Sequence, residues 1–179
     1  MKLKNIMLSV VCFAVLGSGA YLWANAETAK ESQRIEAFNQ YAEVTTWDSL
    51  VNKDADLIIR GMIESADGQT KVMELDTGTL YANRYTVKVE ENVKVAKNAA
   101  EQIIEILETV DPGLKVGNEI ILFGKQKKNG TYTPVGEFGL FVVKNGIAHG
   151  QLVDKDVKEI SVSELLGTAN KVLRAASLE

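Results

Sequence analysis

The triplet Asp76-Thr77-Gly78 is the part of this sequence whose residue types most directly suggest chemistry. The same three residue types carry the catalytic carboxylate of aspartic proteases, in which two carboxylates share one proton. The sequence has no second Asp-Thr-Gly or Asp-Ser-Gly, and Glu74 places a charge where the protease loop has apolar neighbours. Asp and Gly also suit a tight turn, because Gly adopts positive φ and Asp bonds to the nearby backbone. We therefore predict that the triplet is a turn and not a catalytic loop.

Other residues that could act in catalysis or bind a metal lack the partners that such sites need. His149 is the only histidine, and no serine on a sharp strand-to-helix turn accompanies it, so we predict a surface histidine. Zinc sites usually need at least two His or Cys ligands. Asp154, Asp156 and Glu159 are spaced as in part of a calcium loop, but the turn glycine and the distal glutamate are missing. With no glycine-rich phosphate loop either, the sequence predicts no catalytic residue, metal or cofactor.

The N-terminus has the order of regions that is typical of a secretory signal peptide. Two lysines precede an apolar run, small residues follow, and Ala24 with Ala26 forms an A-x-A site. We expect cleavage after Ala26, so that residues 1–26 are the signal peptide. The alternative is an uncleaved membrane anchor over Asn5–Ala26, since about 20 apolar residues span a bilayer. Cleavage is favoured because the small residues 17–19 interrupt the apolar helix.

Cys12 is the only cysteine, and it lies inside the apolar run. A lipoprotein signal needs a small residue before its cysteine, whereas Val11 stands there. A chain that begins at Glu27 has no cysteine, which excludes disulfides, thiolate metal sites and a cysteine nucleophile. Cysteine-free exported chains are common in Gram-positive bacteria, which we expect to be the source.

Composition limits the size of the fold and the choice of partner. The 179 residues are 46% hydrophobic, enough for one sizeable core. The formal net charge of −4 argues against nucleic acid, whose phosphates need a clustered positive field. The one dense basic stretch, KQKKNG at 125–130, is expected to be a solvated hairpin tip.

Helical patterns flank the middle of the chain. Residues 27–46 are polar with a narrow apolar stripe, and we predict a helical linker; a helix that docks on a partner is the alternative. A short helix follows, with Thr45 as its predicted N-cap, and another is predicted over 96–101. In the segment 151–179, Ser161 and Glu164 form a capping box. The helix that follows has one apolar face, made of Leu165, Leu166, Ala169, Val172, Leu173 and Ala176.

Between residues 47 and 150, short apolar strands alternate with turn signals. Tyr85, Val87 and Val89 alternate with polar residues, as in a half-buried strand. The predicted hairpin turns are Asp67-Gly68, Asn129-Gly130 and Asn145-Gly146, the last two of type I′. Strands repeated at about 8–12 residues predict a small all-β barrel or sandwich, on which the C-terminal helix packs.

The strand order resembles that of the netrin-like modules, OB-fold barrels that include the N-terminal domain of the tissue inhibitors of metalloproteinases. Ala55–Arg60 resembles the first strand of that family, Tyr85–Val95 its long strand and Glu119–Gly124 a late strand. The resemblance extends from Trp47 to Gly146, and a similar barrel without cysteines recurs in small exported bacterial proteins. It implies a mainly β fold, a small OB-like β-barrel with a flanking N-terminal helical segment and a C-terminal helix.

The inhibitory mechanism of that family does not carry over to this chain. Its metalloproteinase inhibitors chelate the protease zinc through an N-terminal cysteine, and a processed N-terminus at Glu27 offers none. We therefore expect an exported, non-enzymatic binding or interaction module at the bacterial cell envelope. The alternatives are a protease inhibitor or immunity-type protein that uses another contact, and a hydrolase that uses carboxylates.

The expected partner is an envelope or extracellular protein or a small ligand, and not nucleic acid. Membrane contact is expected only through residues 5–26 if they stay uncleaved. Barrels of this type bind through one sheet face and its loops. Tyr81, Arg84 and Tyr132 are the candidate exposed contacts.

Overall fold

The computed structural model describes residues 46–75, 78–95, 103–109, 113–153 and 158–178. The predicted signal peptide, the linker up to residue 45 and the predicted helix at 96–101 lie outside these ranges. None of the helices in the described part of the chain is long and apolar enough to span a membrane.

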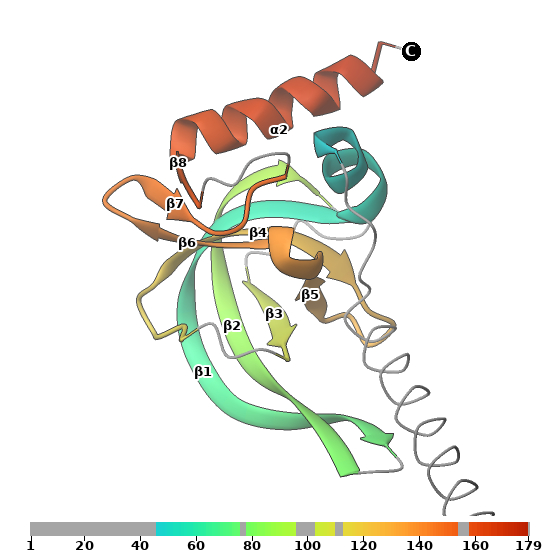
Figure 1. Cartoon of the computed structure of the whole chain (residues 1–179). Helices are drawn as coiled ribbons and strands as arrows, with labels where there is room; N and C mark the ends of the chain where they lie inside the picture. Colours follow the sequence, from blue (N-terminus) through green and yellow to red (C-terminus); the bar gives the residue numbers. More distant parts are fainter. Residues whose placement is uncertain (1–45, 76–77, 96–102, 110–112, 154–157, 179) are drawn as a thin grey trace, which may run out of the picture.

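The described residues form one eight-stranded sheet with a C-terminal helix (Figure 1), which confirms the mainly β class. The strands are β1 (Leu57–Leu75), β2 (Gly78–Lys94), β3 (Ile103–Glu108), β4 (Glu119–Gln126), β5 (Tyr132–Pro134), β6 (Leu140–Lys144), β7 (Ile147–His149) and β8 (Glu159–Ser161). The helices are η1 (Ser49–Asp54), η2 (Gly136–Phe138) and α2 (Val162–Ala176).

Strand pairing closes a circuit through the first five strands. The sheet order is β1-β2-β3-β5-β4-β6-β7-β8, and β1 also pairs with β4 through Leu57–Met62. The pairings are antiparallel except that between β3 and β5, which is parallel and joins Ile106 to Tyr132. We call strands β1 to β5 the ring.

Two apolar clusters lie on the opposite faces of β1 and β4. The ring cluster takes side chains from all five ring strands, among them Leu57, Ile106 and Leu122. The helix-side cluster contains the alternate residues, such as Ile58 and Ile121, together with buried side chains of η1 and α2. Because both faces of β4 are buried, its sequence is a continuous apolar run, and not the alternation of a half-exposed strand.

Strands β5 and β6 pair with consecutive parts of one edge of β4. The short helix η2 interrupts them, and Val135 N and Gly139 O bond to the backbone of Phe123 across the interruption, at 3.0 and 2.8 Å. A Cβ at Gly139 would overlap Val135 N and lie 2.8 Å from Phe123 O. Glycine is therefore required where the chain returns to β4.

The hairpin of β1 and β2 extends past the ring as a two-stranded arm (Figure 1). β1 pairs with β4 only as far as Met62, and β2 pairs with β3 only from Asn83 onward. We call Glu64–Leu75 together with Gly78–Ala82 the arm. Its two strands curve away from the rest of the sheet.

The prediction of a hairpin turn at Asp67-Gly68 is wrong. β1 continues through both residues, and its register with β2 shifts between Ala66 and Gly68. Gly68 has a φ of 78°, so the Asp-Gly pair forms a bulge inside the strand, where glycine accepts the unusual backbone geometry. The chain reverses farther on, since Leu75 pairs with Gly78.

The β4–β5 hairpin turns where the sequence predicts, but the turn type differs. Gly130 N donates to Lys127 O at 3.0 Å, and Lys127 N donates to Thr131 O at 2.8 Å. Gly130 has a φ of 87°, whereas Asn129 is not among the described residues with positive φ. A type I′ turn needs positive φ at both central residues, so that prediction is wrong, and the loop is a three-residue turn with a glycine bulge.

The β6–β7 hairpin confirms the other type I′ prediction. Asn145 and Gly146 have φ values of 52° and 76°, and Lys144 pairs with Ile147 on either side of them. Both central residues are in the left-handed region that this turn requires.

The two flanking helices form close to their predicted positions. Ser161 Oγ accepts a hydrogen bond from Glu164 N at 3.2 Å and caps α2, as predicted. Ala176, placed on the predicted apolar face, is exposed. At the start of η1, the Thr46 hydroxyl accepts a hydrogen bond from Ser49 N at 3.1 Å. Thr45, the predicted cap, lies outside the described residues.

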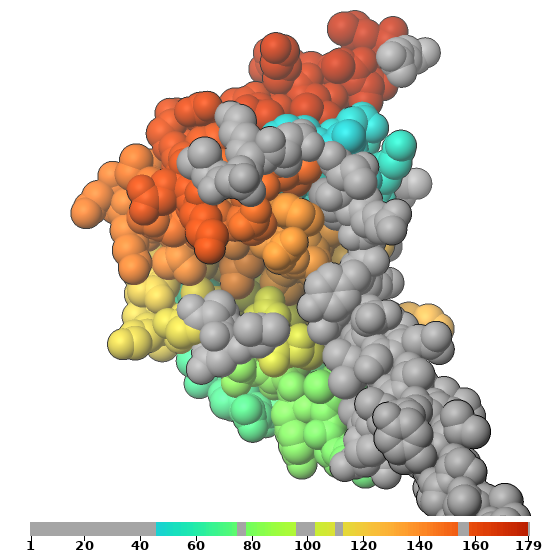
Figure 2. Space-filling view, in the orientation of Figure 1, coloured from blue at the N-terminus to red at the C-terminus, as the bar shows by residue number. Residues whose placement is uncertain are grey.

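Helix α2 covers the helix-side cluster at one end of the molecule. In the space-filling view, α2 (red) lies along the top beside η1 (cyan), and the arm (green) is at the opposite end (Figure 2). Strands β1 and β4 lie between α2 and the ring cluster, and they contribute many of the largest fully buried side chains.

Candidate ligand-binding cleft

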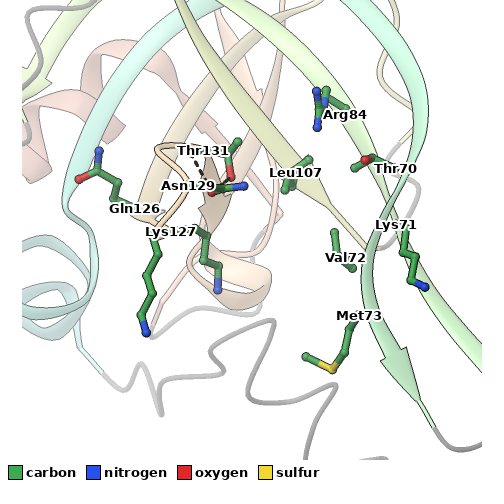
Figure 3. Close-up of a pocket in the computed structure, with 11 residues that line it drawn as sticks. Thr70, Lys71, Val72, Met73, Arg84, Leu107, Gln126, Lys127, Asn129 and Thr131 are labelled. Atoms are coloured by element: carbon green, nitrogen blue, oxygen red, sulfur yellow. Dashed lines mark hydrogen bonds between the residues drawn. The ribbon is translucent and has the colours of Figure 1, made fainter.

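A cleft of about 690 Å³ opens between the arm and the β4–β5 hairpin (Figure 3). Its walls are Thr70–Met73 of the arm and Gln126–Asn129 with Thr131 of the hairpin. Arg84 of β2 and Leu107 of β3 lie between them. Because Arg84 pairs with Gly68 on one side and Leu107 on the other, ring pairing itself fixes this part of the cleft.

Positive charge is concentrated in this cleft, although the whole chain has a formal net charge of −4. Among the residues that the structure describes, the charged ones that line it are Lys71, Arg84, Lys127 and Lys128, and none of these lining residues is Asp or Glu. We call it the basic cleft. A concave site that gathers charges of one sign strengthens the field that attracts an oppositely charged ligand.

Arg84 has an incompletely satisfied guanidinium group. Its Nη1 lies 3.9 Å from Glu105 Oε2, at the limit of an ion pair. Its Nε is buried and has no hydrogen-bond partner among the described residues. A buried donor without a partner is costly and calls for an explanation, and a ligand that accepts hydrogen bonds is one.

Lys71 on the arm and Lys127 on the hairpin have different electrostatic surroundings. On the arm, Lys71 forms an ion pair with Glu74, and the hydrogen bond between them raises the pKa of Lys71. On the hairpin, burial lowers the pKa of Lys127, since its ammonium group is partly removed from water.

Side-chain hydrogen bonds hold the hairpin that carries Lys127 and Lys128. Asn129 Oδ1 accepts from Thr131 N at 3.2 Å and from Thr131 Oγ1 at 2.8 Å. Together with the two backbone bonds across the turn, they fix the shape of the hairpin wall. The two lysines are thus presented from an ordered turn.

A second cleft, of about 740 Å³, lies against the other side of the same hairpin and shares Gln126–Lys128 with the basic cleft. It also contains Asp56 and Lys94. Lys94 Nζ donates to Val51 O at 2.7 Å and to Ala55 O at 2.5 Å, next to the last turn of η1. Lys94 therefore has a structural role, and its cleft lacks the uniform charge of the basic cleft.

Of the three predicted contact residues, the structure brings only Arg84 into the basic cleft. Tyr81 is on the arm and 49% exposed, but it does not line the cleft. The prediction that Tyr132 is exposed is wrong, because its side chain is 0% exposed and packs within the ring cluster. Its hydroxyl accepts a hydrogen bond from Gln126 Nε2 at 3.3 Å.

Sequence reasoning missed the lysines of the cleft. The stretch containing Lys127 and Lys128 is at a hairpin tip, as predicted, but it forms a wall of the cleft as well. Lys71 has no local signal at all, since the arm that carries it lines the same cleft as the hairpin only because the arm curves. A basic run beside a predicted hairpin turn was the available clue for the other two.

The structure describes only some of the residues considered for catalysis or metal binding. Asp76, Thr77, Asp154 and Asp156 lie outside the described residues. His149 is partly exposed on β7, and its Nδ1 lies 3.2 Å from Glu159 Oε1 on the neighbouring strand β8. In the described part of the chain, no group of three or more His, Cys, Asp or Glu is arranged to hold a metal ion.

Comparison of the sequence with protein-family models gives no match, and comparison with curated proteins gives no significant match.

Proposed function

We propose that this chain is an exported, non-enzymatic binding module of the bacterial cell envelope, and that the basic cleft is its ligand site. The observation that carries the proposal is the gathering of Lys71, Arg84, Lys127 and Lys128 around one cavity of an acidic chain. The cavity, about 690 Å³, falls within the range of about 300–1,000 Å³ that is typical of ligand sites.

The pairing of the ring strands supports a finer description of the fold as an OB-like barrel of the netrin-like type. The order β1-β2-β3-β5-β4 with a return to β1 is that expected of a five-stranded closed sheet. OB-fold barrels bind ligands on the face of their second and third strands, between the loops that follow the first and fourth strands. The basic cleft lies between the β1–β2 arm and the β4–β5 hairpin, beside β2 and β3.

Export rests on the sequence alone. The charged, apolar and small-residue regions within residues 1–26 support a cleaved signal peptide, and the absence of cysteine from the rest of the chain supports a Gram-positive source. Blotting of the producing cells checks the first point, because a full-length band in the membrane fraction would contradict cleavage.

Affinity capture with a blocked cleft tests the ligand site. The tagged full chain is incubated with the envelope and secreted fractions of the producing cell, beside Thr70→Trp, which fills the cleft, and Met62→Trp. Met62 is exposed on the same strand and lines neither cleft, so it is the matched control. Circular dichroism first verifies that both variants fold.

We expect a stoichiometric partner that binds the wild type and Met62→Trp and is lost with Thr70→Trp. A protease as that partner would favour the inhibitor alternative. Equal capture by all three chains, or capture by none, would contradict the assignment of the cleft as the ligand site.

A further inference from the structure

The basic cleft combines an apolar floor with charged walls. Val72, Met73 and Leu107 contribute apolar side chains to its lining. The close-up shows Leu107 between the two walls, with Val72 and Met73 on the arm side (Figure 3). A ligand that fits both features carries apolar groups as well as negative charge.

The cationic groups are divided between the two walls. Lys71 is on the arm, Lys127 and Lys128 are on the β4–β5 hairpin across the cleft, and Arg84 lies on β2 between the two walls. A single small anion would contact one wall only. A chain with negative groups on both sides of an apolar group would contact both walls and the floor together.

From this arrangement we infer that the basic cleft binds an extended acidic peptide segment of a protein partner. One carboxylate faces Lys127 and Lys128, another faces Arg84, and an apolar side chain between them rests on Leu107. This inference rests on the proposed function and adds the chemical class of the ligand.

Arg84 is the residue best suited to recognise a carboxylate. A guanidinium group binds a carboxylate through two parallel hydrogen bonds, which a lysine cannot do. Glu105 approaches Nη1 alone, and Nε has no partner among the described residues. A small rotation of the guanidinium that presents Nε and Nη2 to a bound carboxylate satisfies the buried donor.

The lining also favours a peptide over single-stranded nucleic acid. Proteins that bind single strands stack bases on aromatic side chains, and none of the described residues that line the basic cleft is aromatic. Tyr81, the exposed aromatic residue of the arm, is not among these lining residues. The net charge of −4 over the whole chain further opposes a long phosphate backbone, whereas a short acidic segment meets mainly the local field.

An unbiased peptide selection tests the inference. A library of random octapeptides is selected on the purified full chain, with Thr70→Trp as the counter-selection. We expect the recovered peptides to be enriched in Asp and Glu around an apolar residue. Peptides without acidic enrichment that still depend on an open cleft would overturn the inference and leave the proposed function standing. No recovery of cleft-dependent peptides would also overturn it.

Binding of the most enriched peptide is then measured by fluorescence anisotropy. Replacing its acidic residues by Gln and Asn is expected to weaken binding at least about tenfold, since charge-assisted hydrogen bonds are lost. The double variant Lys127→Gln/Lys128→Gln and the single variant Arg84→Gln are each expected to weaken binding about fivefold or more. Lys53→Gln/Lys144→Gln is the matched control, because both lysines are exposed and line neither cleft.

Two further results would contradict the inference. Equal affinity for the acidic and the neutral peptide would show that charge does not select the ligand. Tighter binding of a single-stranded oligodeoxynucleotide of matched charge than of the acidic peptide would assign the cleft to nucleic acid instead. If the envelope partner is still captured in either case, only the acidic-peptide inference fails and the proposed function stands.

Discussion

Lys94 is a partly buried cation with a structural task. Its ammonium group donates to Val51 O and Ala55 O, two carbonyl groups near the C-terminal end of η1, where positive charge is favourable. Burial lowers the pKa of Lys94, and the nearby Asp56 opposes this effect only in part. The bonds stabilise the start of the described chain, while desolvation penalises the charge.

The contribution of Lys94 to stability is therefore expected to rise with pH in the alkaline range. Between the lowered pKa of folded Lys94 and about 10.4 in the unfolded chain, the unfolded state binds more protons, so the free energy of unfolding increases with pH. Lys94→Met should reduce this rise and lower the free energy of unfolding at pH 7 by about 1–3 kcal/mol, because carbonyl groups lose their donor. Urea denaturation at a series of pH values measures both.

Lys144→Met is the control for this substitution, since Lys144 is exposed on β6. It should leave the pH dependence unchanged. Part of the rise should persist in Lys94→Met, because burial also lowers the pKa of Lys127. If the free energy of unfolding of Lys94→Met rises with pH as it does in the wild type, the Lys94 ammonium group is as well solvated in the folded chain as in the unfolded chain.

For single residues, the sequence predicts the burial of some side chains correctly and that of others wrongly. The alternation of Tyr85 and Val87 with polar neighbours correctly indicates which side chains are buried. Tyr132 is misplaced because it follows a polar turn directly, and nothing local indicates that β5 enters the ring cluster within one residue. Thr131 and Thr133 beside it are buried too, so no alternation marks the strand.

Among the elements, the interrupted strand β5–η2–β6 depends on one glycine. Gly139→Ala is expected to lower the free energy of unfolding by about 1–3 kcal/mol, because a Cβ there would overlap the backbone at Val135. Gly167→Ala is the matched control, since Gly167 is exposed in α2 and nothing lies within 4 Å of an added Cβ. It should stabilise the protein by about 0.5–1 kcal/mol through the reduced entropy of the unfolded helix segment.

Thermal or urea denaturation of the two variants gives the comparison directly. Equal effects of both substitutions would show that β5 and β6 can separate from β4 at little cost. Both substitutions add the same methyl group, so the opposite changes expected in the free energy of unfolding come from the surroundings of the two glycines.

The sequence predicts elements better than it predicts turns. Asn145-Gly146 and the Ser161 cap act locally, so their sequence signals are reliable. Asp67-Gly68 has an equally strong turn signal, but β1 continues through it. The pairing of β1 with β2 persists on both sides of these residues, so that they form a bulge in the strand. A glycine that permits a turn also permits a bulge, and only the partner strand decides between them.

For the whole molecule, helix α2 shields the helix-side cluster on the outer face of β1 and β4. Leu165 of α2 is fully buried in this cluster. Leu165→Ala is expected to lower the free energy of unfolding by about 2–5 kcal/mol, which is the usual cost of such a cavity. Leu178→Ala is the control, because Leu178 is 89% exposed, and it should change stability by less than about 0.5 kcal/mol.

Urea denaturation followed by tryptophan fluorescence suits this test, since Trp47 packs against the same cluster. A small effect of Leu165→Ala would mean that α2 is only loosely attached and that the sheet is stable without its cover.

The basic cleft could not be predicted from the sequence, although the β class could. Its walls come from residues near 70, 84, 107 and 127, and these segments meet only because the strands pair in a circuit. Periodicity identifies each strand, but it carries no information on which distant strand becomes its neighbour. Arg84 was predicted as an exposed contact, whereas the lysines that line the cleft with it were not.

The pairing of β1 with β4 has a consequence for the order in which the chain folds. β1 is the first described strand to be synthesised, yet one edge of Leu57–Met62 stays open until β4 has been made. Contacts between such distant segments raise the contact order, and a higher contact order slows folding. Until closure, an apolar strand edge is exposed to other chains, which makes aggregation the main competing reaction. Chaperone protection should therefore matter most for nascent chains that end before Glu119.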